Sequence, residues 1–192
     1  MLQLVQLEVM SKSLKNFLKV AVYDQFWSVV TLNHSKVQKE VLLSRDEAVA
    51  LYAYTVCYPP MYREINAALR EGKLNNFLIK LVDSALNKLP IYTGRIVYRW
   101  SVPTLDEQVK LAGNEVVIDG AYLSTLKAPN ELTMVEHDCM LIKITHLNGR
   151  DISLYSDDYS ADIQEVLIPR GSSFISANLQ EPEFDLTIEQ VA

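Results

Sequence analysis

The sequence changes character at residue 91, and this change limits the folds that the chain can adopt. Before it, apolar residues recur at helical spacing; after it come short runs of β-branched and aromatic residues separated by turn residues. Helices first and strands second indicate an α+β protein, because an α/β sheet would alternate the two along the chain. At 192 residues, the chain can bury a core without a metal or a disulfide.

The helices of the first half are predicted from periodicity and from their end signals. Ser44 and Glu47 have the spacing of a capping box, which marks the start of one helix. Gly72 and Pro90 close two others. The predicted helices span residues 11–31, 48–55, 61–69 and 74–89.

The strands of the second half are predicted at residues 95–100, 115–118, 140–144, 164–168 and 173–176. Residues 177–192 contain four acidic residues and no basic one, so we expect a solvated tail there. We therefore divide the chain into an N-terminal helical extension (1–45), a core domain (46–176) and an acidic C-terminal tail (177–192).

Charge, cysteine use and hydropathy exclude several classes of protein. The net charge of −6 argues against a general nucleic-acid binder. Cys57 and Cys139 belong to no CxxC pair, so neither a zinc site nor a disulfide framework is expected. No apolar run is long enough to span a membrane, and the first ten residues make a poor signal peptide. We expect a cytoplasmic protein.

Common motifs for metals and nucleotides are not predicted. His137, Asp138 and Cys139 are adjacent, and adjacent residues of a strand point to alternate sides, so we expect no metal site there. The chain has neither a P-loop nor the glycine fingerprint of dinucleotide-binding folds. A nucleotide would have to be held by other means.

Three separated segments carry the residues that point to chemistry. A strand ends at Arg99, a polar pair, Ser124-Thr125, follows an aromatic step, and a polar loop leads into a strand bearing Glu165. In this order they resemble the Arg–Ser–Glu class of mono-ADP-ribosyltransferases, which includes bacterial toxins and bacteriophage enzymes. The resemblance covers roughly residues 46–176.

Further segments match this class in the same order. Residues 54–55 with 65–70 resemble its N-terminal helical signature, and 92–99 resemble the strand with the NAD-binding arginine. Residues 149–153 with 165–172 resemble the loop and strand around the catalytic glutamate. The resemblance implies a catalytic core of two packed, mostly antiparallel sheets with flanking helices, preceded by an N-terminal helical region.

The resemblance also implies NAD as co-substrate, no metal, and a role for each residue. Breaking the nicotinamide–ribose bond builds positive charge on the ribose, which a fixed carboxylate stabilises. This role falls to Glu165, held by Ser124, while Arg99 grips the NAD phosphates. A surface glutamate, a strand-edge hydroxyl and a salt-bridged arginine are the ordinary alternatives. The predicted cofactor-binding residues are Arg99, Tyr98, Trp100, Ser124 and Thr125.

The chain departs from this class at three positions. Leu126 replaces a second serine, Trp100 stands where glycine is common, and Ile163 stands where arginine-modifying enzymes carry a glutamate. We hypothesise that a bulge near Ile163 turns Asp162 to the working face, where it partly replaces the missing acid. The predicted acceptor-recognition residues are Tyr159, Asp162 and Ile163.

The predicted activity is transfer of ADP-ribose to a macromolecular acceptor, a host protein side chain such as arginine, with RNA left open. Two alternatives remain. An NAD glycohydrolase is favoured by Ile163, and a catalytically silent interaction module is favoured by Leu126, Trp100 and Ile163 together. We expect a monomer that acts in the cytoplasm of a bacterial host, as a phage product, or in a target cell after injection.

Overall fold

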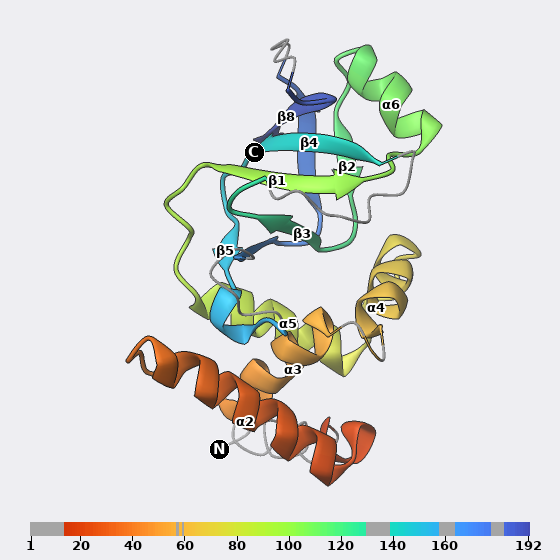
Figure 1. The fold of residues 1–192 in the computed structure, drawn as a ribbon. Coiled ribbons are helices and arrows are strands. Elements are labelled where there is room, and N and C mark those ends of the chain that lie inside the picture. Colours follow the sequence, from red (N-terminus) through yellow and green to blue (C-terminus); the bar gives the residue numbers. More distant parts are fainter. Residues whose placement is uncertain (1–13, 57, 59, 130–138, 158–163, 178–182) are drawn as a thin grey trace. The chain divides into compact units, whose positions relative to one another are not determined.

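The computed structural model describes residues 14–56, 58, 60–129, 139–157, 164–177 and 183–192. The chain forms two compact units, whose elements are labelled in Figure 1. The first unit comprises residues 1–90 and 153–159, and the second comprises 91–152 and 160–192. The boundary that we predicted at residue 45 lies inside the first unit, whereas the change of texture at residue 91 coincides with the division between the units.

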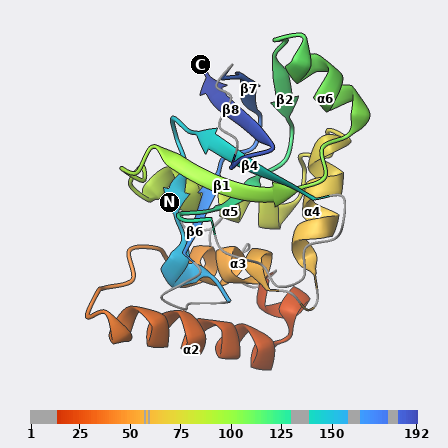
Figure 2. The same ribbon diagram turned by 45° about the horizontal axis from the view of Figure 1, so that its top comes forward.

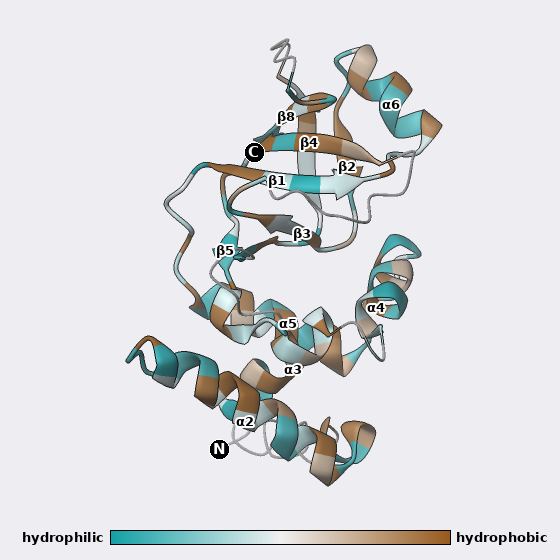
Figure 3. Cartoon of the chain, in the orientation of Figure 1, coloured by the Kyte–Doolittle hydropathy of each residue, from teal (hydrophilic) through white to brown (hydrophobic). Residues whose placement is uncertain are grey.

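The first unit is helical. It contains α2 (Val20–Lys36), α3 (Arg45–Thr55), α4 (Met61–Arg70), α5 (Phe77–Lys88) and a 3-10 turn at Ser153–Tyr155. Helix α3 packs against α2, α4 and α5, and every residue from Glu47 to Tyr54 is buried. A helix that is surrounded on several sides is expected to carry apolar side chains in several directions. In α2, by contrast, hydrophobic and hydrophilic residues alternate, as expected of a helix with one buried face and one exposed face (Figure 3).

The first predicted helix differs from the observed one in its limits. Residues 14–18 are helical, Lys19 has a positive φ of 66°, and α2 then continues to Lys36. Its buried face is formed by Tyr23, Phe26 and Val30, which recur at helical spacing beyond the apolar residues that suggested the helix.

The capping box predicted at the start of α3 is present and extends into a network around Glu47. The Ser44 hydroxyl and backbone N–H donate to its carboxylate at 2.7 and 3.0 Å. The Ser84 hydroxyl donates to it at 2.6 Å, and the Lys88 ammonium lies at the same distance. Burial raises the pKa of this carboxyl group, but the hydrogen bonds from Lys88, Ser84 and Ser44 outweigh burial, so the pKa of Glu47 is lowered.

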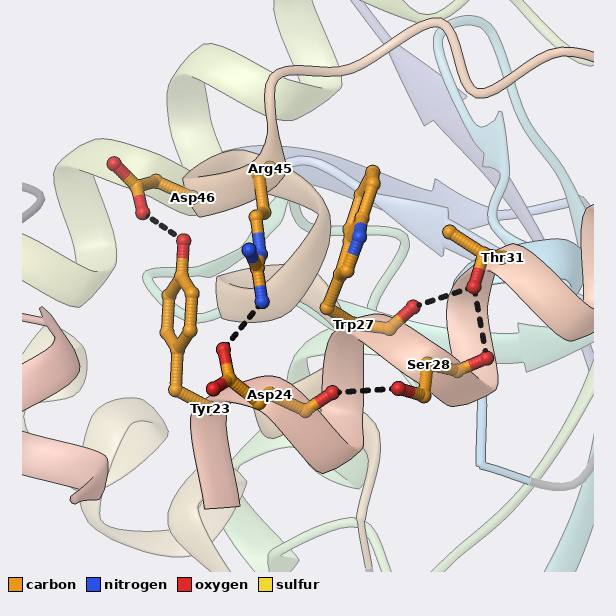
Figure 4. Close-up of polar contacts among 7 residues, drawn as sticks. All are labelled: Tyr23, Asp24, Trp27, Ser28, Thr31, Arg45 and Asp46. Atoms are coloured by element: carbon orange, nitrogen blue, oxygen red, sulfur yellow. Dashed lines mark hydrogen bonds and ion pairs between the residues drawn. The ribbon is translucent and has the colours of Figure 1, made fainter. Parts of the chain in front are cut away.

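A stacked cluster joins α2 to the start of α3 (Figure 4). The Arg45 guanidinium lies between the rings of Tyr23 and Trp27, 4.9 and 5.5 Å from their centroids. Arg45 also pairs with Asp24, and the Tyr23 hydroxyl donates to Asp46. Burial and this hydrogen bond raise the pKa of Tyr23. The cluster orients the two helices through directed contacts.

The described residues of the second unit form a sheet and one helix, α6 (Leu105–Ala112), which contacts β2 and β7 (Figure 2). The described strands run in the order β2-β7-β8-β4-β1-β3-β6-β5, and their pairs are antiparallel except β4 with β8. The strands are β1 (Ile96–Ser101), β2 (Val117–Asp119), β3 (Leu123–Leu126), β4 (Met140–Thr145), β5 (Arg150–Asp151), β6 (Glu165–Ile168), β7 (Ser172–Ser176) and β8 (Leu186–Val191).

The division into two packed sheets that we predicted is not confirmed, because all eight described strands belong to one hydrogen-bonded sheet. Its halves are joined between β1 and β3, where the pairing consists of Tyr98 opposite Leu126. A joint this narrow allows a strongly twisted sheet to bend, so that both halves can cover one apolar core. That core includes Val97, Ile142, Ile144, Phe174 and Ile188 from one half and Leu123, Val166 and Ile168 from the other.

Our prediction of a solvated tail at residues 177–192 is wrong for residues 186–191. Residues 186–191 form β8, which lies between β7 and β4. Ile188 enters the core, and the buried Gln190 amide donates to Asn148 Oδ1 and Ser172 Oγ at 2.9 and 3.0 Å. Because these partners satisfy the glutamine, a polar sequence can occupy an interior strand.

Helix α6 was also not predicted, although Thr104 and Glu107 form a capping box at its start. The helix has 8 residues, little more than two turns, which is too short for apolar periodicity to identify it. Among the described helices, none combines the length and the hydropathy that a membrane crossing requires.

Candidate active site

The predicted serine and glutamate lie on neighbouring strands, β3 and β6, which pair with Leu126 opposite Glu165. Because side chains alternate between the faces of a sheet, Ser124, Leu126 and Glu165 share one face. The Ser124 hydroxyl donates to Glu165 Oε1 at 2.5 Å. Glu165 is 9% exposed. The fold thus brings together a hydroxyl and a carboxylate that are 41 residues apart in the chain.

Thr125, on the opposite face, also links β3 to β6 through a side-chain hydrogen bond. Its hydroxyl donates to the backbone carbonyl of Val166 at 2.6 Å, and both residues are buried. Val166 belongs to the apolar core, so Thr125 links the active-site strands to the interior of the sheet unit. This position supports β6 and does not place the Thr125 hydroxyl beside that of Ser124.

Arg99 lies on β1, next to the joint between β1 and β3. Its Nη1 donates to the backbone carbonyl of Ser124 at 2.6 Å. The described pairing of β1 with β3 is confined to Tyr98 and Leu126, and the Ser124 carbonyl, two residues before Leu126, receives a donor from a side chain of β1. Ser124 therefore bonds both other candidate residues: its backbone carbonyl accepts from Arg99, and its hydroxyl donates to Glu165.

Tyr98 and Trp100 lie on the face of β1 opposite to Arg99. The Tyr98 ring stacks on Phe184, with 5.6 Å between the centroids, and the Lys143 ammonium lies 5.4 Å from the Phe184 centroid. Trp100 is half-buried, opposite Leu141 of β4. The participation of Tyr98 and Trp100 in cofactor binding stays a prediction.

The turn before β5 is shaped by close packing against β6. A Cβ atom added to Gly149 would lie 2.8 Å from Val166 Cγ1, so this position has no room for a side chain. The Gly149 N–H donates to Nδ1 of the buried His146 at 3.0 Å. Burial lowers the pKa of His146, which favours the neutral ring that this acceptor role requires. The turn therefore sets the position of β5 beside β6.

A second cluster lies on the opposite face of β6 from the Glu165 side chain. The Lys127 ammonium is 2.6 Å from Asp151 Oδ2 and 2.9 Å from Gln164 Oε1, and it lies 5.2 Å from the centroid of the Tyr92 ring. The sequence analysis did not single out Lys127. Its place directly after the motif Ser124-Thr125-Leu126, in a region of short strands, was the only signal available.

Several predicted residues fall outside the described part of the chain. These are the acceptor-recognition residues Tyr159, Asp162 and Ile163, and also His137 and Asp138. The bulge hypothesis for Asp162 thus stays a prediction. Within the described residues, no three His, Cys, Asp or Glu side chains gather in a way that could hold a metal ion.

Comparison with known proteins identifies the family of the chain. Residues 25–185 match the model of the ADP-ribosyltransferase exoenzyme family. A Mycobacterium avium (strain 104) protein with the provisional name NAD(+)–arginine ADP-ribosyltransferase Mav is 32% identical over 154 residues, which is 76% of this chain and 18% of that protein. The chain belongs to the ADP-ribosyltransferase exoenzyme family, and it spans under a fifth of the length of this relative.

Solved structures show the same fold. The ADP-ribosyltransferase HopU1 of Pseudomonas syringae pv. tomato DC3000 matches with a TM-score of 0.63 and 23% identity, over 83% of this chain and 82% of its own. Exoenzyme S of Pseudomonas aeruginosa, solved with human 14-3-3 protein beta and carba-NAD, matches with a TM-score of 0.67 and 16% identity, over 95% and 86%. The mixed α+β class that we predicted is thereby confirmed.

Proposed function

We propose that this chain is an NAD-dependent mono-ADP-ribosyltransferase, which cleaves the nicotinamide–ribose bond and transfers ADP-ribose to a macromolecular acceptor. The proposal is supported by the family match and by one observation above all. Arg99, Ser124 and Glu165, from three separate strands, are joined through Ser124 by hydrogen bonds of 2.6 and 2.5 Å.

The chemistry gives each of these groups a task. When the bond between the ribose and the nicotinamide breaks, nicotinamide leaves with the bonding electrons and positive charge develops on the ribose. The Glu165 carboxylate would stabilise that charge, and the Ser124 hydroxyl would hold the carboxylate in place. Arg99 would bind the anionic phosphates of NAD, since a guanidinium matches the geometry of phosphate oxygens.

The acceptor that we propose is an arginine side chain of a host protein. The name of the Mycobacterium avium relative refers to arginine, which supports this type of side chain. Exoenzyme S was solved in complex with a human protein, which supports action inside a host cell. Attack by a guanidine nitrogen on the ribose carbon forms the new bond, and the nitrogen then loses a proton. Ile163 stands where an acid would take that proton, so Asp162 is the proposed substitute.

Replacing Glu165 tests the proposal directly. In Glu165→Gln, we expect NAD cleavage to fall by at least about 100-fold, because a neutral amide cannot stabilise the cationic ribose. The measurement is nicotinamide release from NAD, together with labelling of proteins in a cell lysate by radiolabelled NAD. Glu189→Gln, which changes an exposed glutamate of β8, is the matched control and should retain the wild-type rate.

The same assay separates the remaining readings. Nicotinamide release without labelled protein would identify water as the acceptor and make the chain an NAD glycohydrolase, a reading that Ile163 favours. If calorimetry shows no NAD binding to the wild-type chain, the transferase proposal fails and the fold serves as an interaction module. Full activity in Glu165→Gln would refute the assignment of the catalytic carboxylate.

A further inference from the structure

Besides the bond of its side chain to Ser124, Glu165 is adjacent in sequence to a residue, Gln164, that is bound by Lys127 on the opposite face of the sheet. The Lys127 backbone N–H donates to the Gln164 carbonyl at 2.9 Å, which extends the β3–β6 pairing by one residue beyond Leu126 and Glu165. The Lys127 ammonium also contacts the Gln164 side chain at 2.9 Å. The residue immediately before Glu165 is thus bound through both its backbone and its side chain.

The third partner of Lys127 connects this contact to β5. Asp151 Oδ2 lies 2.6 Å from the Lys127 ammonium, and Asp151 is opposite Val166 in the pairing of β5 with β6. The next residue, Ile152, donates its N–H to the Glu165 carbonyl at 3.0 Å. Lys127, which follows β3, therefore connects β3 to β5, the two strands that flank β6, at the level of the first residues of β6.

The Lys127 side chain is 17% exposed, so most of it is removed from water. A lysine in such a place is costly unless its ammonium is bonded, and here it has a carboxylate, an amide oxygen and the face of the Tyr92 ring. These bonds are directional, and they constrain Gln164 more tightly than an apolar contact would.

We propose that Lys127 is a positioning residue of the active site: by holding Gln164 and Asp151, it fixes the start of β6 and keeps the Glu165 carboxylate on the Ser124 hydroxyl. The proposal rests on the proposed transferase function for its kinetic consequence. Its structural part concerns the order of residues 164–168 and is independent of that function.

The test compares Lys127→Met and Lys127→Arg with the control Lys110→Met, which removes an exposed lysine that pairs with Asp106 at the same 2.6 Å. In Lys127→Met, we expect faster native-state hydrogen exchange in residues 164–168 and a kcat for NAD cleavage lower by about 10-fold to 100-fold, with KM for NAD changed less than about twofold. Lys127→Arg should recover most of kcat, because it restores a cation in the same place.

Unchanged exchange and unchanged kcat in Lys127→Met would overturn the proposal. So would a lower melting temperature with a normal kcat per folded molecule, since that result describes a purely structural lysine. If Lys127→Met does not fold, Gln164→Leu removes one arm of the cluster and keeps the pair of Lys127 with Asp151; normal exchange and kcat there would also overturn it. If the wild-type chain cleaves no NAD, the function proposal has failed and the exchange data alone decide the positioning.

Discussion

Glu47 in the helical unit and Glu165 in the sheet unit are both buried carboxylates, and their surroundings differ in kind. Glu47, 1% exposed, receives the Lys88 ammonium and donors from the cap of its own helix and from the neighbouring helix. Glu165, 9% exposed, receives the hydroxyl of Ser124, which in turn is linked to Arg99 through its backbone.

This difference shows that burial of a carboxylate does not by itself mark a catalytic site. The network of Glu47 closes a helix terminus and neutralises the carboxylate with a lysine, which is a structural task. The Glu165 carboxylate instead accepts from a hydroxyl on a strand that is distant in sequence, and the guanidinium of Arg99 contacts the backbone carbonyl of that same serine. We therefore expect a change at Glu47 to affect folding, and a change at Glu165 to affect catalysis by the large factor given above.

The next largest effect should follow from removing the charge of Glu47. In Glu47→Gln, we expect the free energy of unfolding to fall by about 3 kcal/mol, because the donors around it lose a buried carboxylate partner. Urea unfolding measures this change, and Glu71→Gln, which removes the exposed partner of Lys73, should cost less than about 0.5 kcal/mol. A Glu47→Gln chain of normal stability that has lost its kcat would reverse the comparison.

The pH dependence of stability should carry the signature of the same group. Because the pKa of Glu47 is lowered in the folded chain, its contribution is fully present above the ordinary glutamate pKa and is lost as the pH falls through the lowered value. The difference in unfolding free energy between the wild type and Glu47→Gln should therefore shrink as the pH is lowered from neutral into the acid range. A difference that stays constant would show that the charge of Glu47 is not the stabilising feature.

A substitution at Thr125 should have a smaller effect, and it distinguishes a residue that supports the strands of the site from a residue that takes part in catalysis. Thr125→Val removes the hydroxyl that donates to the Val166 carbonyl and nearly preserves the side-chain shape, so we expect a loss of about 1 kcal/mol in unfolding free energy. NAD cleavage at saturating NAD should change far less than in Glu165→Gln. If Thr125→Val abolishes cleavage and leaves stability unchanged, Thr125 contacts the reacting groups and the division between the two faces of β3 is wrong.

Local signals in the sequence served well where the determining contacts are local. The capping box at Ser44 and Glu47 is present as predicted, because it depends on groups three residues apart. The strands at β1, β4, β6 and β7 were placed within two residues, since each has β-forming residues between turns. The candidates Arg99, Ser124 and Glu165 were named differently, from the resemblance of their three segments to a known class of enzymes.

The order of residues along the chain was therefore enough to predict the α+β class and most helices and strands, and its resemblance to a known class of enzymes supplied the side chains that we assign to catalysis. The tertiary structure alone decided that β8 enters the sheet, that the eight described strands form one sheet, and that Arg99 reaches the Ser124 carbonyl while Lys127 holds Gln164. The reason is one of range. Periodicity and capping act over a few residues, whereas strand pairing and the bonds that satisfy a buried Gln190 or Lys127 depend on partners many residues away, whose positions only the folded chain defines.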